Sequence, residues 1–110
     1  MDKSDAIEAL HALAQETRLE TFRLLVKQGE DGMAAGEIAE TLDVRQNTMS
    51  ANLAVLARAG MVRSVREGRV VRYFANFDGM RGLLAFLMED CCGGNPDKCK
   101  PVLDEIACGC

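Results

Sequence analysis

The sequence contains little proline and histidine, and it has no long apolar run. It contains two prolines and one histidine, and 48% of its residues are apolar. Scarce proline in an apolar-rich chain excludes disorder and favours a helical protein. His11 has no nucleophile near it in the sequence, so we expect no enzyme activity. The longest apolar runs, such as Gly82 to Met88, are far shorter than the roughly twenty residues that cross a bilayer.

The ends of the chain differ in character. Met1 to Leu10 is charged and amphipathic, unlike a secretory signal, which predicts a cytoplasmic protein with reduced thiols. Cysteine is missing from residues 1–90, yet five cysteines follow in the last twenty. A chain of 110 residues has room for one modest core. We therefore predict a folded domain at 1–90 and a cysteine-rich tail at 91–110.

Apolar periodicity predicts a mainly α fold with a small β-hairpin. The opening helix carries Ile7, Leu10, Leu13 and Ala14 on one face, with Ser4 as its candidate N-cap, and a second helix at 16–27 carries Leu19, Phe22, Leu25 and Val26. Helices at 35–42 and 46–59, a hairpin of strands 61–65 and 70–75, and a last helix at 78–89 follow. Gly68 is suited to the hairpin turn, because glycine adopts positive φ freely.

Positive charge is concentrated in one segment of an acidic protein. Residues 45–72 hold six arginines and one acidic residue, a net of +5, within a chain whose total is −4. The rest of the chain therefore carries −9. Such polarity lets one face bind a polyanion while the others repel it.

The helices at 35–42 and 46–59, joined by the short turn at 43–45, form a predicted helix-turn-helix whose second helix suits a major groove. If Met49, Leu53 and Leu56 face the core, the opposite face is free to reach DNA. On and around that face we predict contacts from Arg45, Gln46, Asn47, Thr48, Ser50, Ala51 and Arg58. The hairpin arginines are expected to bind the phosphate backbone, with Arg66 and Arg69 flanking a tip that reaches a minor groove.

These motifs together resemble the winged-helix repressors of the ArsR/SmtB group. The resemblance covers residues 5–88 and is carried by Thr17-Arg18-Leu19, by the run 46–50 with Leu53, Leu56, Gly60 and Val62, and by the hairpin 66–73. It implies a winged helix-turn-helix that forms a homodimer through its first and last helices. It also implies binding to an inverted-repeat operator in double-stranded DNA, with repression until an inducer binds.

The sequence departs from the family at its two common inducer sites. Many members place a Cys-x-Cys motif before the recognition helix, but residues 33–37 read Met-Ala-Ala-Gly-Glu. Another family site uses Asp and His of the last helix, which here contains no histidine. At positions 51 and 52, Ala and Asn replace the longer polar side chains of many relatives, so the operator sequence stays undetermined.

The cysteine tail is the remaining place for an inducer. Cys91 and Cys92 are expected at the end of the last helix, and a turn at 93–96 returns Cys99 toward them. Three thiolates suit trivalent arsenic or antimony, which form pyramidal complexes, whereas structural zinc prefers four tetrahedral ligands. Some relatives of the arsenic-repressor type also place an adjacent cysteine pair and a third cysteine here. We therefore predict As(III), and possible substitution by Sb(III), as inducer at Cys91, Cys92 and Cys99, with no permanent cofactor.

Several alternatives stay open. Cys108 and Cys110 are secondary candidates that could replace one thiol, capture incoming metalloid or complete a four-sulfur zinc or cadmium site. A methylated arsenical would need only two thiols. The same DNA-binding domain could instead serve a thiol redox sensor. A metalloid carrier or reductase would leave the arginine-rich hairpin unexplained.

Overall fold

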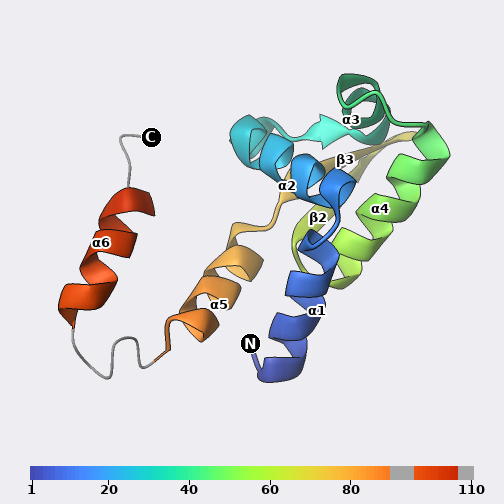
Figure 1. Cartoon of the computed structure of the whole chain (residues 1–110). Helices are drawn as coiled ribbons and strands as arrows, with labels where there is room; N and C mark the ends of the chain where they lie inside the picture. Colours follow the sequence, from blue (N-terminus) through green and yellow to red (C-terminus); the bar gives the residue numbers. More distant parts are fainter. Residues whose placement is uncertain (90–95, 107–110) are drawn as a thin grey trace.

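The computed structural model describes residues 1–89 and 96–106. Its helices are α1 (Lys3–Leu13), α2 (Glu16–Gln28), α3 (Ala35–Thr41), α4 (Gln46–Arg58), α5 (Phe77–Leu87) and α6 (Pro96–Ile106), with a short 3-10 helix at Gly29–Asp31. Its strands are β1 (Met33–Ala34), β2 (Val62–Glu67) and β3 (Val70–Ala75). Figure 1 shows α1 to α4 gathered around the sheet, with α5 leading away from them toward α6. This arrangement is a winged helix-turn-helix.

The hairpin forms as predicted and gains a third strand. β2 and β3 pair antiparallel, and their last partners, Glu67 and Val70, leave a two-residue turn in which Gly68 has a φ of 64°. β1 adds to the other edge of β3 through Met33 opposite Tyr73 and Ala34 opposite Arg72. A strand of two residues has no periodicity, and the sequence analysis did not detect it.

The core lies where α4 meets the other helices and the sheet. Met49, Leu53 and Leu56 are fully buried, together with Leu25 and Ile38. The predicted inward face of α4 is therefore confirmed. That result also fixes the opposite face of the recognition helix as the exposed one.

Most of the apolar residues predicted on one face of α1 do not face the core. Its buried residues are Ala6, Ala9 and Ala12, whereas Ile7 is 61% exposed and Leu10 is 43% exposed. The alanine methyl groups let α1 lie close to its neighbours, and the longer side chains point outward. The N-cap is Asp2 rather than Ser4, because Asp2 and Asp5 form a reciprocal capping box.

The predicted face of α2 is correct only at its centre. Phe22 and Leu25 are buried, but Leu19 and Val26 are 45% and 40% exposed. The buried surface instead includes Thr21, whose hydroxyl donates a hydrogen bond of 2.7 Å to the Thr17 carbonyl oxygen. The burial of a polar residue that forms a hydrogen bond within its own helix cannot be predicted from the spacing of apolar residues.

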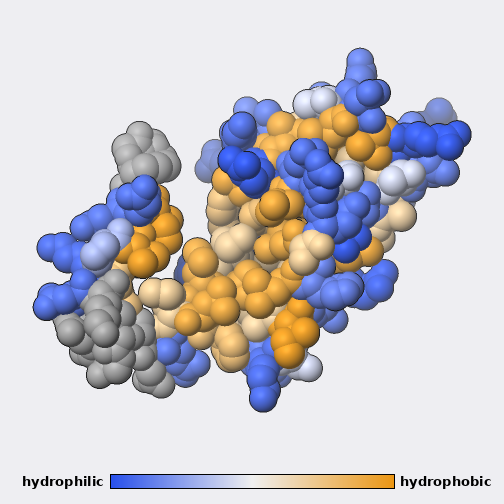
Figure 2. Space-filling model, viewed as in Figure 1, coloured by the Kyte–Doolittle hydropathy of each residue, from blue (hydrophilic) through white to orange (hydrophobic). Residues whose placement is uncertain are grey.

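An apolar surface covers the outside of α1 and α5. Its exposed members are Ile7, Leu10, Leu84 and Leu87, while Leu83 points into the core. Figure 2 shows this apolar area on the face where α5 and α1 lie next to each other. The broad apolar face predicted for the last helix is present, and α5 starts at Phe77 and ends at Leu87.

The first turn of α5 packs closely on the end of α4. A Cβ atom on Gly79 would collide with the Gly60 carbonyl oxygen. The same oxygen accepts a hydrogen bond of 2.9 Å from the Asn76 side-chain amide. Because both contacts involve backbone, neither partner can move aside at low cost.

Replacing Gly79 with alanine should destabilise the fold by about 1–3 kcal/mol, the usual cost of overpacking. Gly82→Ala is the matched control on the same helix, since its Cβ would lie 3.6 Å from the Met1 side chain. That control should be neutral or stabilising by up to about 1 kcal/mol through helix propensity. Urea unfolding midpoints measure both, and equal midpoints for the two variants would contradict the close packing.

The tail contains a longer helix than expected. No helix was predicted after residue 89, but α6 includes both Cys99 and Pro101. Cys91, Cys92, Cys108 and Cys110 lie outside the described residues. Among the described residues, none of the helices is long and apolar enough to span a membrane.

Candidate DNA interface and cysteine site

The turn between α3 and α4 orients the recognition helix. Asp43 takes a positive φ of 54°, and the Val44 N–H donates to the Ala39 carbonyl oxygen at 2.9 Å. Asparagine and aspartate tolerate this conformation better than other non-glycine residues. The chain reverses within a few residues, and Arg45 becomes the N-cap of α4.

The predicted contact residues of α4 lie on its surface. Arg45, Gln46, Asn47, Thr48, Ser50, Ala51 and Arg58 are all exposed, in contrast to the buried Met49 between them. The Asn47 side-chain oxygen accepts a hydrogen bond of 2.9 Å from the Thr48 N–H. The side-chain amide of Asn47 therefore remains available as a donor, whereas the Thr48 N–H is already engaged.

A wide groove separates the start of α4 from the hairpin. Its volume is about 710 Å³, and it is lined by Gln46 and Ser50 of α4, by Arg69 and Tyr73 of the hairpin segment, and by Glu37 of α3. Three residues predicted from separate motifs thus share one open surface. Recognition helix and hairpin tip project on either side of it, as a winged helix needs in order to reach two DNA grooves.

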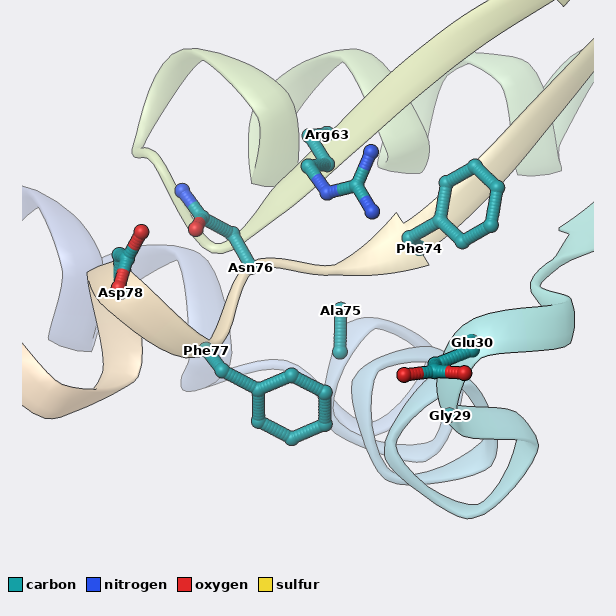
Figure 3. Close-up of a pocket in the computed structure, with 8 residues that line it drawn as sticks. All are labelled: Gly29, Glu30, Arg63, Phe74, Ala75, Asn76, Phe77 and Asp78. Carbon is teal, nitrogen blue, oxygen red and sulfur yellow. The ribbon is translucent and has the colours of Figure 1, made fainter.

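The six arginines of the basic segment are not equivalent. Arg66 and Arg69 are exposed at the hairpin tip, and Arg66 also donates to the Gly68 carbonyl oxygen at 3.2 Å. Arg63 instead stacks over the Phe74 ring, 4.4 Å from its centre, at the cavity of about 240 Å³ shown in Figure 3. Arg63 and Arg72 therefore have partners within the protein, those of Arg72 being given below, and contact of the hairpin arginines with phosphate stays a prediction.

Arg58 lies apart from the other predicted contacts. It is in the last turn of α4, about 18 Å along the helix from Gln46 at 1.5 Å per residue. It lines a cavity with Glu8, His11 and Arg18. Its predicted contact with DNA is untested, and any such contact would be separate from the groove between α4 and the hairpin.

The sequence analysis missed a polar link that holds α4 in place. The Arg18 side chain donates to the Ala12 carbonyl oxygen at 2.6 Å and to the Asn52 side-chain oxygen at 3.3 Å. Asn52 is only 8% exposed, so it supports the recognition helix rather than facing DNA. An arginine and an asparagine 34 positions apart give no local signal.

Of the five cysteines, Cys99 alone lies in the described residues. Its side chain is 4% exposed and is disulfide-bonded. No cluster of three metal-ligating side chains occurs within 1–89 and 96–106, and the predicted set of Cys91, Cys92 and Cys99 extends beyond these residues.

Known proteins share this architecture. A helix-turn-helix domain family matches residues 13–65. The transcriptional activator HlyU of Vibrio cholerae is 27% identical over 94 residues, 86% of this chain and 84% of that protein. A candidate arsenical resistance operon repressor ArsR of Halobacterium salinarum is 33% identical over 79 residues, 72% of this chain and 60% of that protein.

Solved structures agree with the sequence relatives. In one structure of HlyU, 30% identical, the match covers 79% of this chain and 97% of that one, with a TM-score of 0.63. The homodimeric winged helix-turn-helix domain of Mb0332 from Mycobacterium bovis, a candidate ArsR-family regulator, is 28% identical over 79% of this chain and 81% of that one, with a TM-score of 0.64. The chain belongs to the same family of winged helix-turn-helix transcription regulators as HlyU, and its relatives include proteins of the ArsR family.

Proposed function

We propose that this regulator binds an inverted-repeat operator as a cytoplasmic homodimer and represses transcription until trivalent arsenic or antimony binds its cysteine tail. The observation that carries the DNA-binding half is the groove between α4 and the hairpin, where Gln46, Ser50 and Arg69 meet. The exposed residues 45–48, Ala51 and Arg66 extend this surface on both sides. Hydrogen-bond donors face the groove, and arginines flank it.

The apolar surface of α1 and α5 supports the homodimer. Ile7 and Leu87 are more than half exposed, and both lie on the helices through which the family resemblance implies dimer formation. Large apolar patches on a small protein usually mark an interface. The related domain of Mb0332 is homodimeric. In a dimer with two-fold symmetry, the two α4 helices would enter the major groove on the same face of the DNA, one helical turn apart.

The cysteine tail supports the sensor. Cys99 is buried, and Cys91 and Cys92 lie only a few residues upstream. Arsenite at neutral pH is an uncharged trihydroxide, so three thiols condense with it and release three waters. The arsenical resistance repressor of Halobacterium is a relative of this chain, which adds support for the same class of inducer.

Coupling between the two halves follows the chain. α5 contributes to the apolar surface and leads directly into the cysteine tail (Figure 1). Binding of a metalloid at the tail would reposition α5, alter the dimer and change the distance between the two recognition helices. A hundredfold loss of DNA affinity needs about 2.7 kcal/mol of coupling, within the usual allosteric range.

The test is DNA release measured by fluorescence anisotropy. The preferred duplex is first selected from random-sequence DNA by its binding to the reduced protein. The complex of the protein with this duplex, labelled with fluorescein, is then titrated in parallel with arsenite, zinc, cadmium or diamide. Release by arsenite is the expected result. Release by zinc or cadmium alone would overturn the metalloid assignment and leave DNA binding in place. Failure to select any sequence would contradict the proposed operator binding.

A thiol redox sensor is the second candidate, favoured by the disulfide at Cys99. A structure is also known for the reduced form of the relative HlyU. In this mechanism two thiols lose two protons and two electrons to an oxidant and become a disulfide. Diamide is a diazene that accepts the two protons and two electrons and becomes a hydrazide. In this mechanism diamide would release the DNA and dithiothreitol would restore binding, whereas arsenite would have no effect.

A further inference from the structure

Arg72 is surrounded by acceptors from the protein itself. Its Nε donates to Glu67 Oε1 at 3.1 Å. Its Nη1 donates to the carbonyl oxygens of Asp31 at 3.1 Å and Gly32 at 3.4 Å, and lies 4.0 Å from Glu37 Oε1. The side chain is 31% exposed, less than the carboxylates of Glu67 at 55% and Glu37 at 59%.

The acceptors come from three separate parts of the fold. Glu67 ends β2 at the hairpin turn, Asp31 and Gly32 precede β1, and Glu37 is in the first turn of α3. The oxygen of Glu37 that faces Arg72 also accepts the Ala34 N–H at 3.0 Å at the start of α3. Arg72 therefore connects the hairpin to the segment that begins the helix-turn-helix.

The same connection is reinforced by close backbone packing. Gly32 has a φ of 61°, and a Cβ atom there would come within 2.6 Å of the Tyr73 carbonyl oxygen and the Phe74 ring. Glycine fits at this position because it adopts positive φ freely and has no Cβ atom. Beside it, Ala34 of β1 is the register partner of Arg72. The loop before α3 thus lies directly against β3, and the Arg72 side chain extends across it.

We propose that Arg72 is a positioning residue for DNA binding, which fixes the hairpin relative to α3 and α4 without contacting phosphate. This inference depends on DNA binding by the groove between α4 and the hairpin. The hairpin tip and α4 must reach two DNA grooves at once, so without Arg72 the free energy of restoring their relative orientation is lost from binding, while the phosphate contacts of Arg66 and Arg69 still form in the complex. Arg72 has one charge, and its Nε and Nη1 donors are directed to Glu67 and to the two carbonyl oxygens.

The experiment measures affinity for the selected duplex between 50 and 300 mM salt, using reduced full-length protein without inducer. Arg72→Gln should bind about tenfold more weakly at each salt concentration, equivalent to about 1.4 kcal/mol, with an unchanged salt slope. Arg66→Gln is the matched variant with the same change of charge. Its slope should become shallower by about 1.8, because a dimer loses two phosphate contacts at about 0.9 each.

A second variant separates positioning from simple charge. Glu67→Gln removes a negative charge near DNA, so electrostatics alone would strengthen binding. If Glu67 holds Arg72, this variant weakens binding, and combining it with Arg72→Gln adds little further loss. This variant also keeps the test decisive if Arg72→Gln fails to fold.

Two outcomes would overturn the proposal. A slope for Arg72→Gln that changes as much as that of Arg66→Gln would make Arg72 a phosphate contact. Wild-type affinity in both Arg72→Gln and Glu67→Gln would show that the connection has no influence on binding. Failure of DNA binding itself is distinguishable, because the wild-type protein would then show no salt-dependent affinity for the duplex.

Discussion

DNA affinity should fall on the order of a thousandfold at 0.1 M salt when Arg66 and Arg69 are both replaced by alanine. Both side chains are exposed at the hairpin tip, on the side of the groove opposite α4. With about four phosphates neutralised by each subunit, the logarithm of the binding constant should fall with the logarithm of salt concentration at a slope near −7. The double variant removes four of these contacts from a dimer and leaves a slope of about −3.6.

Arg23→Ala is the control for lost charge. Arg23 is an exposed arginine of α2, outside the basic segment, and its removal changes the net charge without touching the hairpin. Its slope should match that of the wild type. Anisotropy titrations at four or more salt concentrations give all three slopes, and a wild-type slope in the double variant would show that the hairpin does not contact the DNA backbone.

Replacement of Cys99 by serine should abolish the roughly hundredfold release of DNA that we expect arsenite to cause in the wild type. A serine hydroxyl is a poor ligand for arsenic, so the site would keep only two of three thiolates. Affinity in the absence of arsenite should not change, because α6 is far in sequence from the DNA surface. Cys91→Ser should behave in the same way.

The control for this prediction lies at the end of the tail. Cys110→Ser removes a thiol that we regard as a secondary candidate, and release by arsenite should persist. Thermal unfolding without arsenite checks that Cys99→Ser, at a position only 4% exposed, still folds. Normal release in both Cys91→Ser and Cys99→Ser would exclude these thiols as the inducer site, and loss of a diamide response alone would favour the redox mechanism.

The local parts of the DNA-binding surface could be predicted from sequence. Met49, Leu53 and Leu56 repeat at helical spacing and are fully buried, which correctly assigned the exposed face of α4. Gly68 marked the hairpin turn and has positive φ. These features depend on residues within one or two turns of each other, where periodicity and turn chemistry are reliable guides.

The errors concern residues whose role depends on distant partners. An arginine count cannot show that Arg63 stacks on Phe74 or that Arg72 binds the loop before α3. The apolar spacing of α1 identified Ile7 and Leu10 but could not show which of two apolar faces meets the core. The thiol set of the tail stays a prediction, since of its members only Cys99 is in the described residues.

The alanine face of α1 has a consequence for how the protein is maintained at low abundance. Each chain buries Ala6, Ala9 and Ala12 internally and leaves Ile7 and Leu10 largely in water. In the proposed homodimer, much of the hydrophobic stabilisation of α1 would come from the second subunit. The free energy of unfolding of each subunit would therefore depend on its association with the other. Dilution would then loosen the subunit itself, and a regulator present in few copies per cell would be removed by proteolysis unless it had found its partner.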